Sequence, residues 1–215
     1  MSQTSTIHED FLRSLSFGLH KLAQPLSVIS GFLELSLDGE YEMPSREMTE
    51  RLLDESRRAS GIAQFVMQLT RFQLPASDVR SVLLSETLES ALTDISGALA
   101  EAEIRIEFQR PENERLIQAS PARLREAIFR LLDAIRMSSV AGDAIRIELI
   151  PDKNQLTLMI FRERNTAHSS KTQISNDCEP ASRALTLAQT VVSGAGGTFT
   201  GSLEPLFVRA EFPVI

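Results

Sequence analysis

The sequence lacks tryptophan and has a single cysteine, Cys178, among its 215 residues. One cysteine cannot form a disulfide within the chain, and no cluster of cysteine and histidine has the spacing of a zinc site. No apolar run reaches the ~18 residues that a membrane-spanning helix requires. Residues 1–10 contain neither the basic nor the apolar segment of a secretory signal. We therefore expect a cytoplasmic protein with no membrane association.

Positive charge and glycine are also scarce. The chain carries 22 lysines and arginines against 29 aspartates and glutamates, a net charge of -7. This excess of negative charge disfavours a nucleic-acid partner. Ten glycines are few for a protein that cradles phosphates in glycine-rich loops. The remaining composition is that of a globular protein, in a chain long enough for one large domain or two small ones.

Apolar residues recur at alternating spacings of three and four in the N-terminal part of the chain. The series runs through Leu12, Leu15, Leu19, Leu22, Leu26, Ile29 and Leu33. This heptad pattern, with the series at positions a and d, predicts a long helix with a continuous apolar stripe. Asp38-Gly39 interrupts the pattern and indicates a loop.

A second helix is expected to follow this loop and to run antiparallel to the first. Ser45 is suited to cap its N-terminus, and its own apolar stripe begins at Met48 and ends before Leu74-Pro75. A single hairpin cannot bury two wide apolar stripes, whereas two hairpins can bury them as a four-helix bundle. We therefore expect a homodimer.

The first helix also contains a proline, Pro25, with a histidine, His20, about one helical turn before it. A proline inside a helix removes a backbone hydrogen bond and costs about 3 kcal/mol. It leaves the carbonyl of Lys21 without its usual donor, so the helix can bend there. His20 falls at heptad position b, outside the apolar stripe, and should be accessible to solvent. A surface histidine without a role is the alternative.

Residues 20–35 read HKLAQPLSVISGFLEL and resemble the H-box of sensor histidine kinases, H-[ED]-x-x-[TNQ]-P-L followed by an apolar helix. In this resemblance His20 matches the phosphoacceptor histidine, Gln24 the polar position and Pro25-Leu26 the fixed pair. The resemblance implies that residues 1–75 form a dimerisation and histidine phosphotransfer hairpin. One departure is Lys21, which stands where the family has an acidic residue implicated in autophosphorylation and phosphatase chemistry.

Residues 76–215 alternate between helical and strand patterns. Helices are expected over residues 85–102, 121–139 and 181–197. Strands are expected over residues 104–108, 116–120, 143–151, 155–163, 198–204 and 206–214. Helices interleaved with antiparallel strand pairs predict a two-layer α/β sandwich. The order of elements resembles the ATP-binding domain of histidine kinases, so the expected fold class is α+β, a helical hairpin followed by an ATPase-like sandwich.

The three nucleotide-binding motifs of that family have no match in this sequence. RLLDAI at residues 130–135 replaces N-L-L-x-N-A, FRERNTA at 161–167 replaces D-x-G-x-G, and SRALTL at 182–187 replaces G-x-G-L-G. In the family that this sequence resembles, the first motif holds magnesium and the nucleotide phosphates, the second binds adenine, and the third binds phosphate. Each loss should weaken nucleotide binding by about one to a few kcal/mol. We therefore expect a degenerate domain with no cofactor and no metal site.

The resemblance, together with the missing nucleotide motifs, implies a histidine phosphotransferase of a bacterial two-component phosphorelay. It would move a phosphoryl group between the aspartates of response-regulator receiver domains through His20, without using ATP. The receiver would bring Mg2+. Lys21 could neutralise charge on the phosphoryl group, or it could be a solvated lysine without a role. The alternative function is a non-catalytic pseudokinase scaffold that binds a receiver domain or a kinase. An active kinase is disfavoured by the missing motifs.

A receiver domain that reaches His20 must lie across both helices of the hairpin. Positions equally far from the turn are paired in an antiparallel hairpin, which puts residues 60–66 opposite His20. Beside Lys21 and Gln24, the docking surface is expected to include Phe17, Ser27, Gln64, Met67 and Gln68. Phe17 is the strongest candidate because heptad position f gives it no stripe to fill. Packing against the C-terminal domain is the alternative for this side chain.

Overall fold

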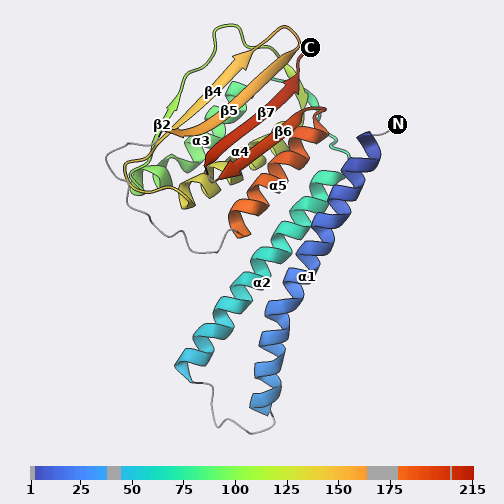
Figure 1. Cartoon of the computed structure of the whole chain (residues 1–215), viewed down its shortest axis with the longest axis vertical. Helices are drawn as coiled ribbons and strands as arrows, with labels where there is room; N and C mark the ends of the chain where they lie inside the picture. Colours follow the sequence, from blue (N-terminus) through green and yellow to red (C-terminus); the bar gives the residue numbers. More distant parts are fainter. Residues whose placement is uncertain (1–2, 38–44, 164–178, 204) are drawn as a thin grey trace. The chain divides into compact units, whose positions relative to one another are not determined.

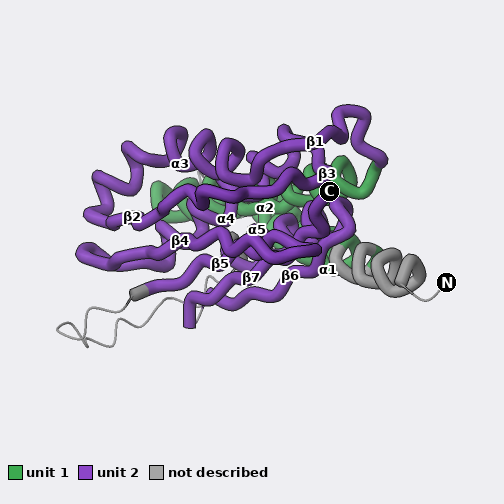
Figure 2. The backbone as a smooth tube through the Cα atoms, turned by 90° about the horizontal axis from the view of Figure 1, so that it is seen from above, with its two compact units in different colours: residues 1–74 green, residues 75–215 purple. Residues whose placement is uncertain are grey.

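The computed structural model describes residues 3–37, 45–163, 179–203 and 205–215. The chain divides into two compact units, residues 1–74 and 75–215, drawn in green and purple in Figure 2. Cys178 and residues 164–167, the end of the stretch FRERNTA, lie outside the described ranges. None of the helices within those ranges has a stretch both long and apolar enough to cross a bilayer.

The first unit is a pair of helices, α1 (Gln3–Leu37) and α2 (Arg46–Gln73), as Figure 1 shows. The hydroxyl of Ser45 accepts a hydrogen bond from the N–H of Met48 at 3.2 Å, which confirms Ser45 as the N-cap of α2. Helix α2 ends at Gln73, and its C-cap Leu74 precedes Pro75. The residue before a proline disfavours helical geometry, which explains the end of the helix. The sequence-predicted helical hairpin is therefore present, and α1 continues through Pro25.

The heptad positions of α1 differ in their surroundings. At position g, Gly18 and Pro25 are buried, and at position d, Leu22 and Ile29 are partly buried. The leucines at position a are about half exposed: 49% for Leu12, 51% for Leu19, 47% for Leu26 and 54% for Leu33. One hairpin therefore covers only part of the predicted stripe and leaves a line of leucines open on one flank of α1.

The second unit contains a five-stranded sheet in the order β2-β4-β5-β7-β6. Its strands are β2 (Arg105–Phe108), β4 (Ala144–Pro151), β5 (Gln155–Glu163), β6 (Thr198–Leu203) and β7 (Leu206–Pro213). Alternate residues of β4 and β7 are buried, as expected for a sheet that packs one face against a core. In β4, for example, Ile145, Ile147 and Leu149 are buried.

Three helices cover that face of the sheet: α3 (Leu84–Glu101), α4 (Pro121–Met137) and α5 (Glu179–Gly194) (Figure 1). Each contributes fully buried apolar side chains to the core, such as Leu88, Leu132 and Leu187. The second unit is therefore the two-layer α/β sandwich that the alternating patterns predicted.

Two features of this unit differ from the prediction. A short strand, β1 (Arg80–Val82), pairs with β3 (Ile117–Ala119) in a separate two-stranded sheet. The sequence predicted antiparallel strand pairs but no partner for β2, which lies parallel to β4. The physical reason is the long connection: β3 and α4 intervene between β2 and β4, and such a crossover returns the chain in the same direction.

The segment that follows α2 is bonded to the start of α4. The Arg123 guanidinium donates to the carbonyl of Pro75 at 3.4 Å. The Asp78 carboxylate lies near Ser120, Ala122 and Arg123 at the start of α4. The Ser120 hydroxyl, together with backbone N–H groups and the charge of Arg123, outweighs desolvation and lowers the pKa of Asp78 below its usual 3.8.

We expect Asp78→Asn to remove a stabilising contribution that depends on pH. Because the pKa of Asp78 is lower in the folded protein than the usual 3.8, its contribution is present above that pH and is lost as the pH falls through the folded-state pKa. The difference in urea midpoint between wild type and variant should be largest at neutral pH and shrink in acid. Urea unfolding at a series of pH values measures this difference. A difference that does not vary with pH would show that the charge of Asp78 plays no part.

Candidate functional site

His20 has an exposed side chain on α1, and Pro25 is buried on the opposite side of the same helix. The residue that interrupts the backbone hydrogen bonds of α1 is therefore also part of the packed hairpin. Gln24, one turn beyond His20, is exposed as well. The hydroxyl of Ser27 donates to the carbonyl of Ala23 at 2.9 Å, so it is bonded within α1 near the interruption.

Gly18 brings α1 and α2 close together near His20. A Cβ atom on Gly18 would lie 2.8 Å from Cγ2 of Val66 and 4.0 Å from the ring of Phe65. If residues 18 and 66 are level in an antiparallel pair, residue 64 is level with His20. Gln64 therefore lies at the height of the histidine, within the range expected from the turn.

The predicted docking residues of α2 differ in exposure. Gln64 and Met67 are exposed, whereas Gln68 is partly buried. Met67 is a large apolar side chain that stands open on α2. These side chains could therefore meet a partner without any rearrangement of the hairpin.

We expect Gly18→Leu to destabilise the hairpin by about 1–3 kcal/mol, because the added atoms would overlap Val66 in a packed contact. Gly18→Ala is the matched control. Its Cβ still requires the stiff Val66 side chain to shift, but it adds fewer atoms than leucine, and alanine is favoured over glycine in a helix by about 1 kcal/mol, so its loss of stability should be smaller. Thermal unfolding followed by circular dichroism compares the two. Equal stability of both variants would mean that the helices do not touch at this level in solution.

Lys21 is the only charged residue over a long part of the hairpin. Residues 14–33 of α1 and 59–70 of α2 contain no other lysine, arginine, aspartate or glutamate. The Lys21 ammonium lies over the ring of Phe17, 5.5 Å from its centroid. Phe17 itself is 58% exposed. The face that carries His20 thus presents one cation, one open aromatic ring and otherwise uncharged groups.

In the sequence, Lys21 was notable as a departure from a motif, whereas its place as the single charged residue of these two stretches was not predicted. A count of charged residues along the two helices would have revealed this feature from the sequence. Its contact with Phe17 also follows from their spacing, because residues four apart are neighbours on a helix. Within the described ranges, no three histidine, cysteine, aspartate or glutamate side chains are placed to share a metal ion.

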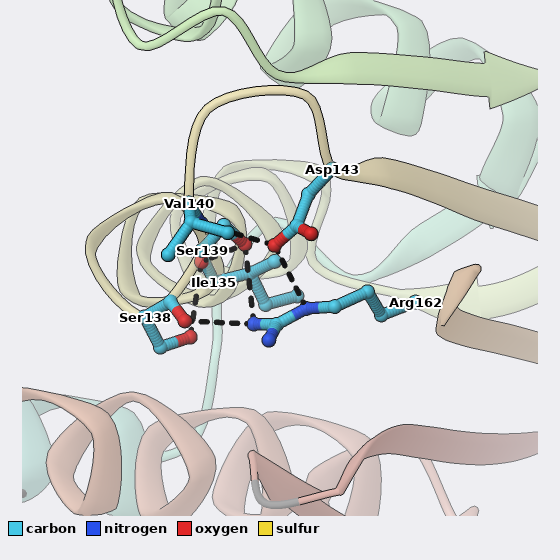
Figure 3. A network of polar contacts seen from close by, with 6 residues as sticks. All are labelled: Ile135, Ser138, Ser139, Val140, Asp143 and Arg162. Carbon is cyan, nitrogen blue, oxygen red and sulfur yellow. Dashed lines mark hydrogen bonds and ion pairs between the residues drawn. The ribbon is translucent and has the colours of Figure 1, made fainter. Parts of the chain in front are cut away.

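In the second unit, a buried ion pair lies at the end of β5, in the stretch that stands in place of D-x-G-x-G (Figure 3). Nε of Arg162 is 3.3 Å from Oδ2 of Asp143, and both side chains are largely buried. The Arg162 guanidinium also donates to the carbonyl of Ser138, the C-cap of α4, at 2.8 Å. The N–H of Val140 donates to Asp143 at 3.0 Å. These polar groups therefore bind one another and tie β5 to the end of α4.

The other two replaced stretches lie on helices. On α4, Arg130 lies 3.6 Å from Glu126 in an ion pair, and Ala134 is buried. On α5, Ala184 and Leu187 are buried in the core. The side chains of these stretches are therefore engaged in ion pairing or in packing within the second unit.

Comparison with solved structures relates this fold to histidine kinases. The histidine kinase AdeS of Acinetobacter baumannii matches with 17% identity and a TM-score of 0.60, over 91% of this chain and 96% of that one. The histidine kinase ThkA, crystallised with the response regulator protein TrrA, matches with 11% identity and a TM-score of 0.61, over 99% of this chain and 63% of that one. A histidine kinase from Burkholderia phymatum STM815 matches with 14% identity and a TM-score of 0.50, over 92% and 96%.

No protein-family model matches the sequence, and no curated protein matches it. At these identities the structural likeness shows the fold alone. That fold is a helical hairpin followed by a mixed α/β sandwich, the arrangement of the phosphotransfer hairpin and ATPase domain of histidine kinases. The chain thus has a histidine kinase-like fold.

Proposed function

We propose that this protein is a histidine phosphotransferase, which moves a phosphoryl group between the aspartates of receiver domains through His20 without using ATP. The observation that carries the proposal is the surroundings of His20. The imidazole is exposed on a hairpin of the histidine kinase-like fold, and residues 14–33 of α1 and 59–70 of α2 around it hold no charged residue besides Lys21. Such a face is open to an anionic group and presents no carboxylate that would repel it.

The chemical step follows from the groups involved. A neutral imidazole nitrogen of His20 attacks the phosphorus of the receiver's aspartyl phosphate. The new N–P bond forms as the P–O bond to the aspartate breaks, and the carboxylate leaves with the electron pair. The other ring nitrogen of His20 gives up its proton to water. The reverse sequence on a second receiver returns the phosphoryl group to an aspartate. The receiver supplies Mg2+ in both steps, so this chain needs no metal of its own.

The receiver partner is supported by the likeness to ThkA, which was crystallised with a response regulator. On this chain, the proposed docking surface consists of Phe17, Lys21, Gln24 and Ser27 of α1 and Gln64, Met67 and Gln68 of α2. Apolar groups at its centre, Phe17 and Met67, are exposed and would be covered by the receiver. The intrahelical bond of Ser27 makes its hydroxyl a weaker contributor than the others.

The proposal also includes a homodimer. The open leucines at position a of α1 repeat every seventh residue, and the e positions beside them hold only small residues, Ser16, Ala23 and Ser30. A second copy presents the same uncharged flank, so the two surfaces complement each other about a twofold axis. A four-helix bundle would cover the leucines that one hairpin leaves open.

Labelled phosphate tests the proposal directly. Receiver domains of the same genome are loaded from labelled acetyl phosphate, freed of the donor and mixed with the protein in Mg2+. We expect label to appear on this chain as phosphohistidine, which is stable to base and lost in acid. Receivers that bind the protein but never transfer label to it would favour the scaffold alternative.

We expect Mg-ATP to bind weakly, if at all, and to leave the protein unphosphorylated. The three stretches that replace the nucleotide motifs offer a buried Arg162–Asp143 pair, an Arg130–Glu126 pair and apolar core residues. Isothermal titration calorimetry measures the affinity. A dissociation constant below about 100 μM, equivalent to roughly -5.5 kcal/mol, would contradict this expectation.

A further inference from the structure

Strand β2 stands at one edge of the five-stranded sheet and covers only the first half of β4 (Figure 1). Residues 105–108 of β2 are paired with residues 144–147 of β4, which continues to Pro151. On its other side β4 is paired with β5 along its whole length. Among the described residues, therefore, no strand lies beside residues 148–151 on the side of β2. The backbone N–H and C=O groups of such an open edge can bond to an added strand.

A groove of about 810 Å³ lies along this open edge. Beyond the end of β2, the guanidinium of Arg110 lies 3.6 Å from Glu86 and 3.9 Å from Glu89 of α3. Residues 109–112 line the groove together with residues 146–150 of β4. Because a strand advances about 3.3 Å per residue, the open stretch of β4 is about 13 Å long and can pair with about four residues of an extended peptide.

The lining of the groove combines apolar and charged side chains. Ile106 and Phe108 of β2 are half-buried, and Ile150 of β4 is 44% exposed. These side chains offer apolar contacts to a segment that lies along the edge. The charged side chains of the lining are Glu107, Arg110, Glu112, Arg146 and Glu148.

The charges of this lining do not cancel. Arg146 lies 3.1 Å from Glu107, and Arg110 pairs with α3. Within the described part of the chain, neither Glu112 nor Glu148 takes part in an ion pair. Both arginines are therefore matched by carboxylates, while two further carboxylates remain for a cation from outside the chain.

We propose that this groove binds an extended peptide segment of a partner protein, which adds to the sheet beside residues 148–151 of β4 and places a lysine or arginine next to Glu112 and Glu148. Backbone hydrogen bonds to β4 hold the segment, and the two carboxylates select a basic side chain. The inference goes beyond the proposed function, because it concerns the second unit alone and does not depend on His20. It gives a binding role to the sandwich that lacks the three nucleotide motifs.

An array of blocked octapeptides tests this proposal on the full-length protein. Valine and threonine alternate in these peptides, and one residue is varied among lysine, arginine, glutamine and glutamate. Fluorescence anisotropy measures the affinity of labelled members for wild type, for Glu112→Gln/Glu148→Gln and for Glu101→Gln. Glu101 is the matched control, because it is an exposed carboxylate that does not line the groove. Circular dichroism checks that the variants are folded.

We expect lysine and arginine members to bind and glutamate members not to bind. Glu112→Gln/Glu148→Gln should weaken binding of the basic members about three- to tenfold, as expected for the loss of two exposed ion pairs. Glu101→Gln should leave the affinity unchanged.

A second series of peptides, each methylated at one backbone nitrogen, tests the strand pairing itself. Methylation replaces an N–H donor, and only every second residue of a strand directs its N–H toward a given neighbour. Methylation at alternate positions should therefore weaken binding at least about tenfold, with little effect at the positions between them.

Three outcomes would overturn the inference. The first is that no basic member of the array binds. The second is equal affinity of a basic peptide for wild type and Glu112→Gln/Glu148→Gln, which would place its binding outside the groove. The third is binding that is insensitive to methylation, or equally sensitive at every position, which would mean that the carboxylates attract a cation without any pairing to β4.

Discussion

His20→Gln is expected to abolish phosphoryl transfer from receiver domains to this protein. Glutamine keeps a polar, hydrogen-bonding side chain at the same place but has no nucleophilic nitrogen, because its amide lone pair is delocalised. The rate of label uptake should fall by at least about a thousandfold, to the background of the assay. The side chain is exposed, so the substitution removes no packing and should leave the stability of the hairpin almost unchanged.

His8→Gln is the matched control, because His8 also lies on α1. It should take up label at the wild-type rate. Thermal unfolding of both variants checks that the helices remain folded. If His20→Gln still took up label and His8→Gln did not, the phosphoacceptor would be His8 and the site described here would be wrong.

The architecture of the hairpin could be predicted from sequence because its signals are local. The heptad leucines, the Ser45 cap and the stop before Pro75 act within a few residues, and the structure has each of them. The pattern did not reveal which part of the apolar stripe faces α2. Burial of Gly18 and Pro25 shifts that contact toward positions g and d, and a glycine carries no apolar signal in a hydrophobic pattern.

Pairing in the second unit was harder to predict because it depends on contacts distant in sequence. Strand β1 has only three residues, too few for an alternation to be recognised, and is held by β3 far along the chain. The parallel register of β2 with β4 likewise depends on how the chain returns through α4. The long hairpin from β4 to β5, with a tight turn between two alternating runs, was predicted with its bounds nearly unchanged.

In the candidate site, sequence identified the exposed histidine and its neighbours on α1, and the structure shows how two of these neighbours contact each other. The contact between Lys21 and Phe17 joins two residues that had been given separate roles. In the sequence, Arg162 was noted only as a member of FRERNTA, the stretch that replaces the D-x-G-x-G motif. Its alternation with Ile160 and Leu158 would have predicted that it points into the core, where only a buried carboxylate such as Asp143 makes a charge tolerable.

Leu26→Glu is expected to convert the proposed dimer into a monomer. Leu26 is 47% exposed in the single chain and lies midway along the open line of leucines, so a second copy would bury it. A glutamate there would place an unpaired charge in the interface, which costs about 3–5 kcal/mol. The dimer dissociation constant should therefore rise at least about a hundredfold. Leu22, in the same stripe, is less suitable for this test because it is already partly buried within the hairpin, and its substitution would disturb the folded monomer as well.

Val28→Glu is the matched control, because it introduces the same charge on the same helix but on the flank opposite Leu26. Val28 is exposed to a similar degree, 43%, so the change costs little in the single chain. Analytical ultracentrifugation at micromolar concentration should find a dimer for wild type and Val28→Glu and a monomer for Leu26→Glu, with all three equally helical. A wild type that sediments as a monomer would contradict the bundle. Dissociation by Val28→Glu but not by Leu26→Glu would instead place the interface on the flank that carries Lys21, where a second copy would compete with a receiver for the surface beside His20.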